Sequence, residues 1–283
     1  MKTLTDSYLL NNGVKIPCVG FGTWQTPDGE TAVQSVLAAI KAGYRHIDTA
    51  AAYGNEKSVG DAIKICGVNR EELFITTKLW NAERGYEKTL AAFESSMEKL
   101  QLEYLDLYLI HWPAAKGEPG EWQKINLDTW HAFEYLYETK RVKAIGVSNF
   151  LPHHLAPIVR DAKIPPIVNQ IEFHPGYMQK EAVDFCIENN ILVEAWSPLG
   201  TGKMLSNPTL IGIAEKYGKS TAQLCVRWCL QNNTLPLPKS VTPARIEENA
   251  KVFDFEISPE DMTAINNMPF FAGSGFYPDE INF

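Results

Sequence analysis

The sequence lacks the features that define several broad classes of protein. No apolar run reaches about 18 residues, so we expect no membrane-spanning helix and no membrane partner. The net charge is −8, which argues against the basic face of a general nucleic-acid-binding protein. The N-terminal segment Met1–Tyr8 has no apolar core, so no secretory signal peptide is expected. A globular protein remains, in keeping with 45% apolar and 21% charged residues.

Cysteine is scarce, and its spacing fits neither a disulfide framework nor a metal site. The five cysteines are odd in number, scattered, and include no Cys-x-x-Cys pair. We therefore expect free thiols and a cytoplasmic location. Cys225 and Cys229 lie four residues apart on an expected helix, and no nearby His or Cys completes a metal site. We expect both to pack inward and predict no bound metal.

The chain does contain a regular alternation of apolar runs and amphipathic segments. The runs are Cys18–Thr23, Tyr44–Thr49, Leu73–Trp80, Tyr104–Trp112, Lys143–Phe150, Ile167–Phe173, Ile191–Pro198 and Leu235–Ser240. Such near-continuous runs are typical of parallel strands buried on both faces. Eight strand–helix repeats in about 250 residues predict an α/β fold, the (β/α)8 TIM barrel. The alternative is a doubly wound open sheet, but Gly20 and Gly22 lack the third glycine of its Gly-x-Gly-x-x-Gly fingerprint.

Local signals mark where several helices begin and end. Thr31 and Gln34 have the spacing of a capping box, and Gly43 suits the end of the same helix. Thr242-Pro243 and Ser258-Pro259 each combine an N-cap residue with a proline at the first helical position. These signals place helices between the apolar runs, as a barrel requires.

The ends of the chain and its longest loop can also be predicted. Asn12-Gly13 lies between two short apolar runs and predicts an N-terminal β-hairpin. Pro113–Asn126 reads as a longer loop, and Phe270–Phe283 reads as a tail without regular structure. We see no composition break or linker, so we predict that residues 1–283 form a single domain.

Four ionisable side chains stand where consecutive strands of the expected barrel end. Asp48 ends the second strand and Tyr53 lies in the loop after it, while Lys78 and His111 end the third and fourth. Each alone has an ordinary explanation, such as a cap, loop packing or a core histidine. Neighbouring strands lie about 5 Å apart, so all four groups are expected to meet at the catalytic end of the barrel.

These four groups indicate acid–base chemistry on a carbonyl. A free phenol has a pKa of ~10, and a neighbouring ammonium such as Lys78 is expected to lower it. Asp48 would keep Lys78 charged, Tyr53 would donate a proton to a forming alkoxide, and His111 would orient the carbonyl oxygen. Reduction also needs a hydride, which side chains do not supply, so a nicotinamide cofactor is expected.

The later strand ends carry candidate cofactor ligands. Ser148, Asn149 and Gln170 offer polar groups for a carboxamide, and Trp196 offers a flat face for a pyridine ring. The residues after Trp196 include further candidates, Ser197, Leu199 and Gly200.

The last strand is followed by a candidate phosphate site. Lys239 and Ser240 end the strand, and a helix containing Arg245 begins shortly after. Two cations at one point of an acidic protein favour a 2′-phosphate, and hence NADP(H) over NAD(H).

Aromatic residues beside the catalytic positions outline a substrate pocket. Trp24 follows the first strand, Trp80 lies two residues past Lys78, and Trp112 follows His111. We expect these residues, with His111, to contact substrate, and we expect Tyr277 in the tail to cover the pocket.

Three segments in order give the sequence a clear resemblance to the aldo-keto reductases. They are Gly43–Ala50 with Glu56 and Gly60, Ile145–Phe150, and Leu237–Ser240 with Arg245, Glu248 and Asn249. The resemblance implies the tetrad Asp48, Tyr53, Lys78 and His111. It also implies nicotinamide contacts from Ser148, Asn149 and Gln170, ring stacking by residue 196, and contacts to the adenine-ribose phosphate from Lys239, Ser240, Arg245, Glu248 and Asn249.

Two departures from the family pattern bear on substrate and cofactor. Many members have Tyr where this chain has Trp196, and stacking should survive because indole has the larger π-face. The short loop after strand seven and the short tail resemble the compact bacterial branch, which includes reductases of keto-sugar acids such as 2,5-diketo-gluconate and of small aldehydes.

The sequence therefore predicts a monomeric, NADPH-dependent reductase of small aldehydes or ketones. Two alternatives stay open. Lys78 could form a Schiff base in a barrel lyase, or the fold could serve as a non-catalytic NADPH-binding regulatory or scaffold protein.

Overall fold

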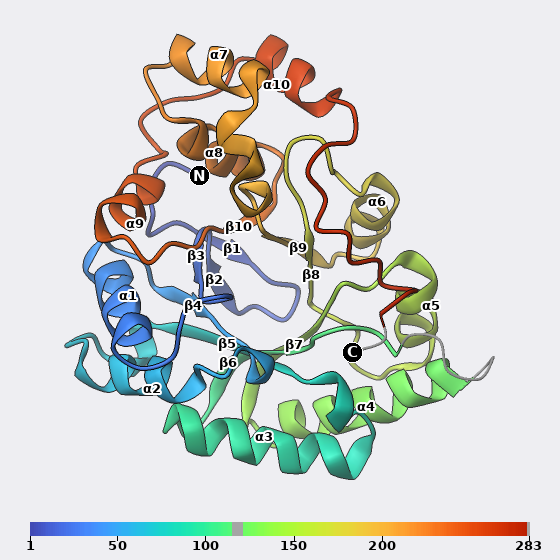
Figure 1. Ribbon diagram of the computed structural model, residues 1–283. Coiled ribbons are helices and arrows are strands. Elements are labelled where there is room, and N and C mark those ends of the chain that lie inside the picture. Colours follow the sequence, from blue (N-terminus) through green and yellow to red (C-terminus); the bar gives the residue numbers. More distant parts are fainter. Residues whose placement is uncertain (115–120, 282–283) are drawn as a thin grey trace.

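The computed structural model describes residues 1–114 and 121–281, and a barrel of parallel strands forms its centre (Figure 1). The strands are β3 (Gly20–Gly22), β4 (His46–Asp48), β5 (Phe74–Leu79), β6 (Leu105–Ile110), β7 (Val142–Ser148), β8 (Val168–Glu172), β9 (Leu192–Trp196) and β10 (Leu235–Leu237). They lie in chain order in one eight-stranded sheet, and each paired neighbour is parallel. The predicted (β/α)8 TIM barrel is confirmed.

The two edges of the sheet meet at a pair of glycines. The Gly22 amide donates a hydrogen bond of 3.1 Å to the Pro238 carbonyl, which joins β3 to the end of β10. A Cβ atom at Gly20 would collide with the Leu237 side chain and stand 2.6 Å from His46 Nδ1. Close packing where the barrel closes therefore requires glycine at these positions. This role accounts for Gly20 and Gly22, and a dinucleotide-binding Gly-x-Gly-x-x-Gly motif is not needed to explain them.

Helices surround the barrel (Figure 1). They are α1 (Glu30–Lys41), α2 (Glu56–Ile65), α3 (Tyr86–Leu100), α4 (Glu121–Glu138), α5 (Pro152–Asp161), α6 (Lys180–Glu188), α7 (Pro208–Lys216), α8 (Thr221–Gln231), α9 (Pro243–Ala250) and α10 (Pro259–Asn266). Short 3₁₀ turns are η1 (Ala51–Tyr53), η2 (Arg70–Glu72), η3 (Asn81–Glu83) and η4 (Gly200–Ser206).

Some predicted helix boundaries are right and others are wrong. Ser258 caps α10 through a bond from the Asp261 amide, and Pro243 begins α9 after Thr242, as predicted. The capping box at Thr31 is wrong, because α1 begins at Glu30 with Gly29 as its N-cap, so Thr31 lies inside the helix, and Gln34 Nε2 donates to Glu30 Oε1 instead. The predicted loop 113–126 is too long, since α4 already begins at Glu121; residues 115–120 lie outside the described chain.

The N-terminal hairpin closes one end of the barrel. Strands β1 (Ser7–Leu9) and β2 (Lys15–Pro17) pair antiparallel, as predicted. Leu10 and Ile16 are buried in a cluster with interior residues of the barrel, including Phe74, Val168 and Leu235. Because this end is filled with apolar side chains, polar chemistry is confined to the other end, where the strands finish.

The C-terminal tail has no helix or strand in its described part, residues 267–281, and runs past α6 and α5 (Figure 1). The Phe271 amide donates to the Gly176 carbonyl at 3.1 Å, and Ser274 Oγ donates to Glu172 Oε2 at 2.6 Å. These bonds hold the tail at the carboxyl end of β8. No helix in the described part of the chain has the length and apolar character to cross a membrane.

Candidate functional site

The four predicted catalytic groups lie together at the carboxyl end of the barrel. Lys78 Nζ is 2.7 Å from Asp48 Oδ1 and 3.2 Å from Tyr53 Oη. The ring centroids of Tyr53 and His111 are 5.6 Å apart, in an edge-on arrangement. The proximity expected from strand order is therefore present, and Lys78 is the link between the carboxylate and the phenol.

Lys78 is fully buried, with 0% of its surface exposed, and its ammonium is fully hydrogen-bonded. Its third bond, of 2.9 Å, goes to the Thr49 carbonyl, so all three N–H donors have acceptors. Burial alone would lower the pKa of Lys78, but Asp48 and Tyr53 together raise it above its usual value. A charged lysine without a free lone pair is a poor nucleophile, which disfavours the Schiff-base lyase.

The expected lowering of the Tyr53 pKa is not found. Burial raises the pKa of Tyr53 above its usual value, and the opposing effect of Lys78 offsets burial only in part. Tyr53 is therefore protonated at neutral pH, as a proton donor must be. Burial, with the charges of Lys78 and Arg84, holds the pKa of His111 well below its usual value, so its imidazole is neutral.

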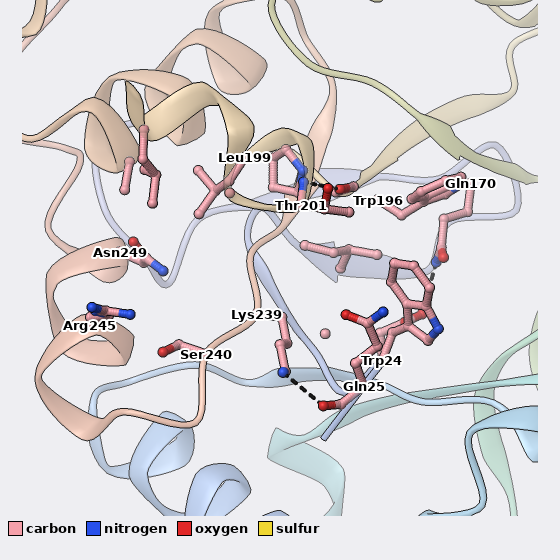
Figure 2. A pocket seen from close by; sticks show the side chains of 18 of the residues that line it. Trp24, Gln25, Gln170, Trp196, Leu199, Thr201, Lys239, Ser240, Arg245 and Asn249 are labelled. Carbon is pink, nitrogen blue, oxygen red and sulfur yellow. Dashed lines mark hydrogen bonds between the residues drawn. The ribbon is translucent and has the colours of Figure 1, made fainter. Parts of the chain in front are cut away.

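A cavity of about 870 Å³ begins at these groups and extends to α9. Tyr53, His111 and the predicted substrate residues Trp24, Trp80 and Trp112 line it at the catalytic end. The predicted cofactor residues that line it are Ser148, Asn149, Gln170, Trp196, Ser197, Leu199, Lys239, Ser240, Arg245, Glu248 and Asn249. Gly200 is buried and lies outside the lining. Figure 2 shows Trp24, Trp196 and Gln170 at one side and Arg245, Ser240 and Asn249 at the other.

The Asn149 side chain connects the catalytic end of the cavity to Trp196. Its Nδ2 donates to the His111 carbonyl at 3.0 Å, and its Oδ1 accepts a bond of 2.7 Å from Trp196 Nε1. Asn149 has a φ of 64°, in the left-handed region that asparagine tolerates. Ser148 Oγ donates to the Gln170 carbonyl at 2.8 Å. These two residues position the indole and neighbouring backbone, in addition to lining the cavity.

Gln170 lies between two carboxyl groups. Its Nε2 donates to Asp48 Oδ2 and to Glu194 Oε2, each at 2.8 Å. Glu194 is fully buried, and burial and the Asp48 charge raise its pKa to about 8. Glu194 was not predicted as a site residue, although strand alternation places it on the same face as Trp196.

The residues predicted to bind the phosphate lie at the far end of the cavity. Lys239 Nζ donates to the Gln25 carbonyl at 3.0 Å, as Figure 2 shows, and partial burial lowers the pKa of Lys239. The Arg245 side chain is exposed at the first turns of α9. Neither cation is paired with a carboxylate in the part of the chain described, so both remain available to an anion.

Parts of the cavity wall were not predicted from the sequence. Residues of η4 and the neighbouring helices, such as Thr201, Leu205 and Ile211, line it because the chain after β9 folds back over the barrel. Tyr277, expected to cover the pocket, is 48% exposed and does not line it. Its neighbour Phe276 does, packed edge-on against Trp112 with ring centroids 6.2 Å apart.

One group of described residues has metal-ligand types and spacing, and it lies outside the cavity lining. It comprises His153, His154 and Asp279. His154 Nδ1 accepts a bond of 3.2 Å from the Leu151 amide, so Nε2 carries the proton that points to Asp279 at 3.1 Å. A metal would need that nitrogen deprotonated. The group instead ties the tail to α5.

Known proteins resemble this chain along nearly its whole length. Glyoxal reductase of Bacillus subtilis is 52% identical over 281 residues, which cover 99% of each chain. Among solved structures, MGS-M4, an aldo-keto reductase from a deep-sea metagenome library, has a TM-score of 0.92 at 45% identity and covers 98% of this chain and 100% of its own. A mutant of Gox0644 in complex with NADPH has a TM-score of 0.91 at 40% identity and 99% coverage of each chain. The sequence model of the Aldo/keto reductase family matches residues 18–268, and the chain belongs to that family.

Proposed function

We propose that the protein reduces aldehydes or ketones to alcohols with NADPH, and that Tyr53 donates the proton. Family membership makes the chain an oxidoreductase that acts on carbonyl groups, with NADPH/NADP⁺ as cofactor. The proposed roles rest on the position of Lys78 Nζ, which lies 2.7 Å from Asp48 Oδ1 and 3.2 Å from Tyr53 Oη, beside the cavity.

Each residue of the tetrad has a distinct task. Tyr53 holds its proton until the carbonyl oxygen gains negative charge, and then transfers it to the forming alkoxide. The Lys78 ammonium stabilises the phenolate that remains, and Asp48 keeps Lys78 charged and in place. The neutral His111 imidazole orients the carbonyl oxygen toward Tyr53. Proton transfer of this kind contributes roughly 10²–10⁴ in rate.

The residues along the cavity fit a dinucleotide. Trp196 lines the cavity near the catalytic end, and Lys239 and Arg245 line it near α9 as cations without a carboxylate partner among the described residues. When bound, NADPH supplies the hydride. The chain's own part is to hold the nicotinamide near Tyr53 and His111, and to bind the 2′-phosphate through Lys239, Ser240 and Arg245.

A panel of carbonyl compounds tests the proposal through the loss of NADPH absorbance. Because one relative is named glyoxal reductase, small 1,2-dicarbonyls come first, followed by aldehydes, diketones and keto-sugars. The aromatic walls Trp24, Trp80 and Trp112 favour compounds with an apolar or planar group. Absence of turnover across the panel, with NADPH bound, would favour the scaffold alternative. Borohydride-trapped substrate on Lys78 without NADPH oxidation would favour the lyase.

We also propose that residues 1–283 act as one domain, as a monomer in the cytosol. The five cysteines are free, and Cys18, Cys186, Cys225 and Cys229 are buried, as a reducing compartment permits. Light scattering after size exclusion should give a mass near 31.7 kDa. A mass of twice that value would contradict the monomer.

A further inference from the structure

We infer that Glu194 is a positioning residue for the cofactor, acting through Gln170. The inference rests on the proposed NADPH-dependent function. Glu194 accepts one hydrogen bond from Gln170 Nε2 at 2.8 Å, and Asp48 Oδ2 accepts the other at the same distance. Glu194 is fully buried, lies outside the cavity lining and is not one of the proposed tetrad, so it acts on the cofactor through Gln170, which does line the cavity.

The two bonds determine which way the Gln170 amide faces. Asp48 is bound to the Lys78 ammonium at 2.7 Å and acts as an acceptor. An amide turned the other way would place an oxygen against that carboxylate, with no proton between the two atoms. Nε2 must therefore face Asp48 and Glu194. Two bonds from one nitrogen also fix the plane of the amide, which a single bond to Asp48 would leave free to rotate.

This arrangement leaves Gln170 Oε1 as the polar atom that the residue offers to a ligand. Gln170 lines the cavity, as Tyr53 and Trp196 do, and both hydrogens of its Nε2 are already used. A carbonyl-type oxygen accepts hydrogen bonds and does not donate them. Gln170 is therefore set to accept from the N–H of a primary amide, such as the nicotinamide carboxamide.

Glu194 can hold this position whether it is charged or neutral. Its Oε1 has no hydrogen-bond partner in the described chain and lies 3.9 Å from His46 Nε2. A proton on Oε1 leaves Oε2 free to accept from Gln170. Burial and the Asp48 charge raise the pKa of Glu194 to about 8, so the neutral form is present at neutral pH. Glu194→Gln is the isosteric equivalent of that form, while Glu194→Met fills similar volume without an acceptor.

The test compares two cofactors that differ only in the group proposed to donate to Gln170 Oε1. The 3-acetylpyridine analogue of NADP⁺ keeps the ring carbonyl but replaces the carboxamide NH₂ with a methyl group. Dissociation constants for NADP⁺ and the analogue are measured by quenching of tryptophan fluorescence, which Trp24 and Trp196 in the cavity wall should report. We expect the wild type to prefer NADP⁺ by about 3- to 10-fold, the effect of one hydrogen bond.

Two variants of Glu194 separate a role in positioning Gln170 from an effect on folding stability alone. Glu194→Gln should keep the preference for NADP⁺, and Glu194→Met should reduce it to less than about 2-fold. Thermal melting reports whether each variant folds. If Glu194→Met does not fold, Glu194→Ala is measured in its place. An unchanged preference in Glu194→Met, or no preference in the wild type, would overturn the inference alone. Failure of the wild type to bind NADP⁺ at all would instead overturn the proposed function.

Discussion

Trp196 Nε1 donates a hydrogen bond of 2.7 Å to Asn149 Oδ1, and this bond sets the plane of the ring proposed to stack on nicotinamide. The type of residue matters here, because a tyrosine at this position would have no donor at the place of the indole N–H. The same Asn149 side chain holds the His111 carbonyl at 3.0 Å. One residue thus links the proposed stacking ring of Trp196 to His111.

A double-mutant cycle measures this link. Trp196→Phe leaves Asn149 Oδ1 without its donor, and Asn149→Gly removes the acceptor while suiting the φ of 64°. Each single change should lower the free energy of unfolding by about 1–3 kcal/mol in urea titrations. The coupling between them should be at least about 0.5 kcal/mol. Additive effects would mean that the hydrogen bond is energetically unimportant.

The phosphate assignment is tested by the choice between NADPH and NADH. Lys239→Ala combined with Arg245→Ala should weaken NADPH binding by about 10²-fold or more, because two charge-assisted bonds are lost. NADH binding should change by less than about 3-fold. Lys251→Ala is the matched control, since this exposed lysine just after α9 pairs with Glu247. Equal losses of affinity for NADPH and NADH would mean that Lys239 and Arg245 do not bind the 2′-phosphate.

Close packing of α2 on α3 depends on Gly60. A Cβ atom there would overlap the backbone of Leu100, which has little freedom to move. Gly60→Ala should therefore lower the free energy of unfolding by about 1–3 kcal/mol. Gly212→Ala in α7, where a Cβ would meet nothing within 4 Å, should be neutral or stabilising. Similar denaturation midpoints for the two variants would contradict this role for Gly60.

Glu194 makes stability depend on pH in an unusual direction. Its pKa is raised from 4.5 to about 8, so between these values the folded protein holds a proton that the unfolded chain has released. The contribution of Glu194 to the free energy of unfolding is therefore fully present below about pH 4.5 and is lost as the pH rises through about 8. The loss is at most about 1.4 kcal/mol per pH unit. The charged groups near Glu194 are Asp48 and Lys78, while the His46 imidazole, 3.9 Å away, is neutral because burial and the Lys78 charge lower its pKa to about 3.

Glu194→Gln removes this titration. The difference in unfolding free energy between the variant and the wild type should therefore move in favour of the variant as pH rises from about 5 to about 7.5. Urea titrations at both pH values measure it, and taking the difference cancels the other titrating groups. Parallel pH profiles for the two proteins would show that Glu194 is ionised in the folded state.

Most of the site could be predicted because parallel strands end at one face of a barrel. Asp48, Lys78 and His111 are far apart in sequence, yet their places at the ends of successive strands were enough to bring them together. The cations Lys239 and Arg245 were predictable for a similar reason, as they flank the start of a helix.

What could not be predicted depends on burial and on contacts made by loops. The pKa of Tyr53 is raised and not lowered, because burial outweighs the nearby ammonium, and burial is set by the whole fold. Phe276, and not Tyr277, lines the cavity because the tail is tied down at Glu172 and Asp279. The alternation of side chains along a strand puts Glu194 on the same face of β9 as Trp196, but only the structure shows which groups Glu194 binds.

In the proposed mechanism Tyr53 gives its proton to the substrate, while Lys78 and Asp48 keep the phenol in position for the transfer. The most direct test is Tyr53→Phe, which removes one hydroxyl and keeps the ring in contact with His111. NADPH binding should be nearly unchanged, and the rate of reduction in a single turnover should fall by roughly 10²-fold or more. A Tyr53→Phe protein that binds NADPH and reduces carbonyls at close to the wild-type rate would show that Tyr53 is not the proton donor.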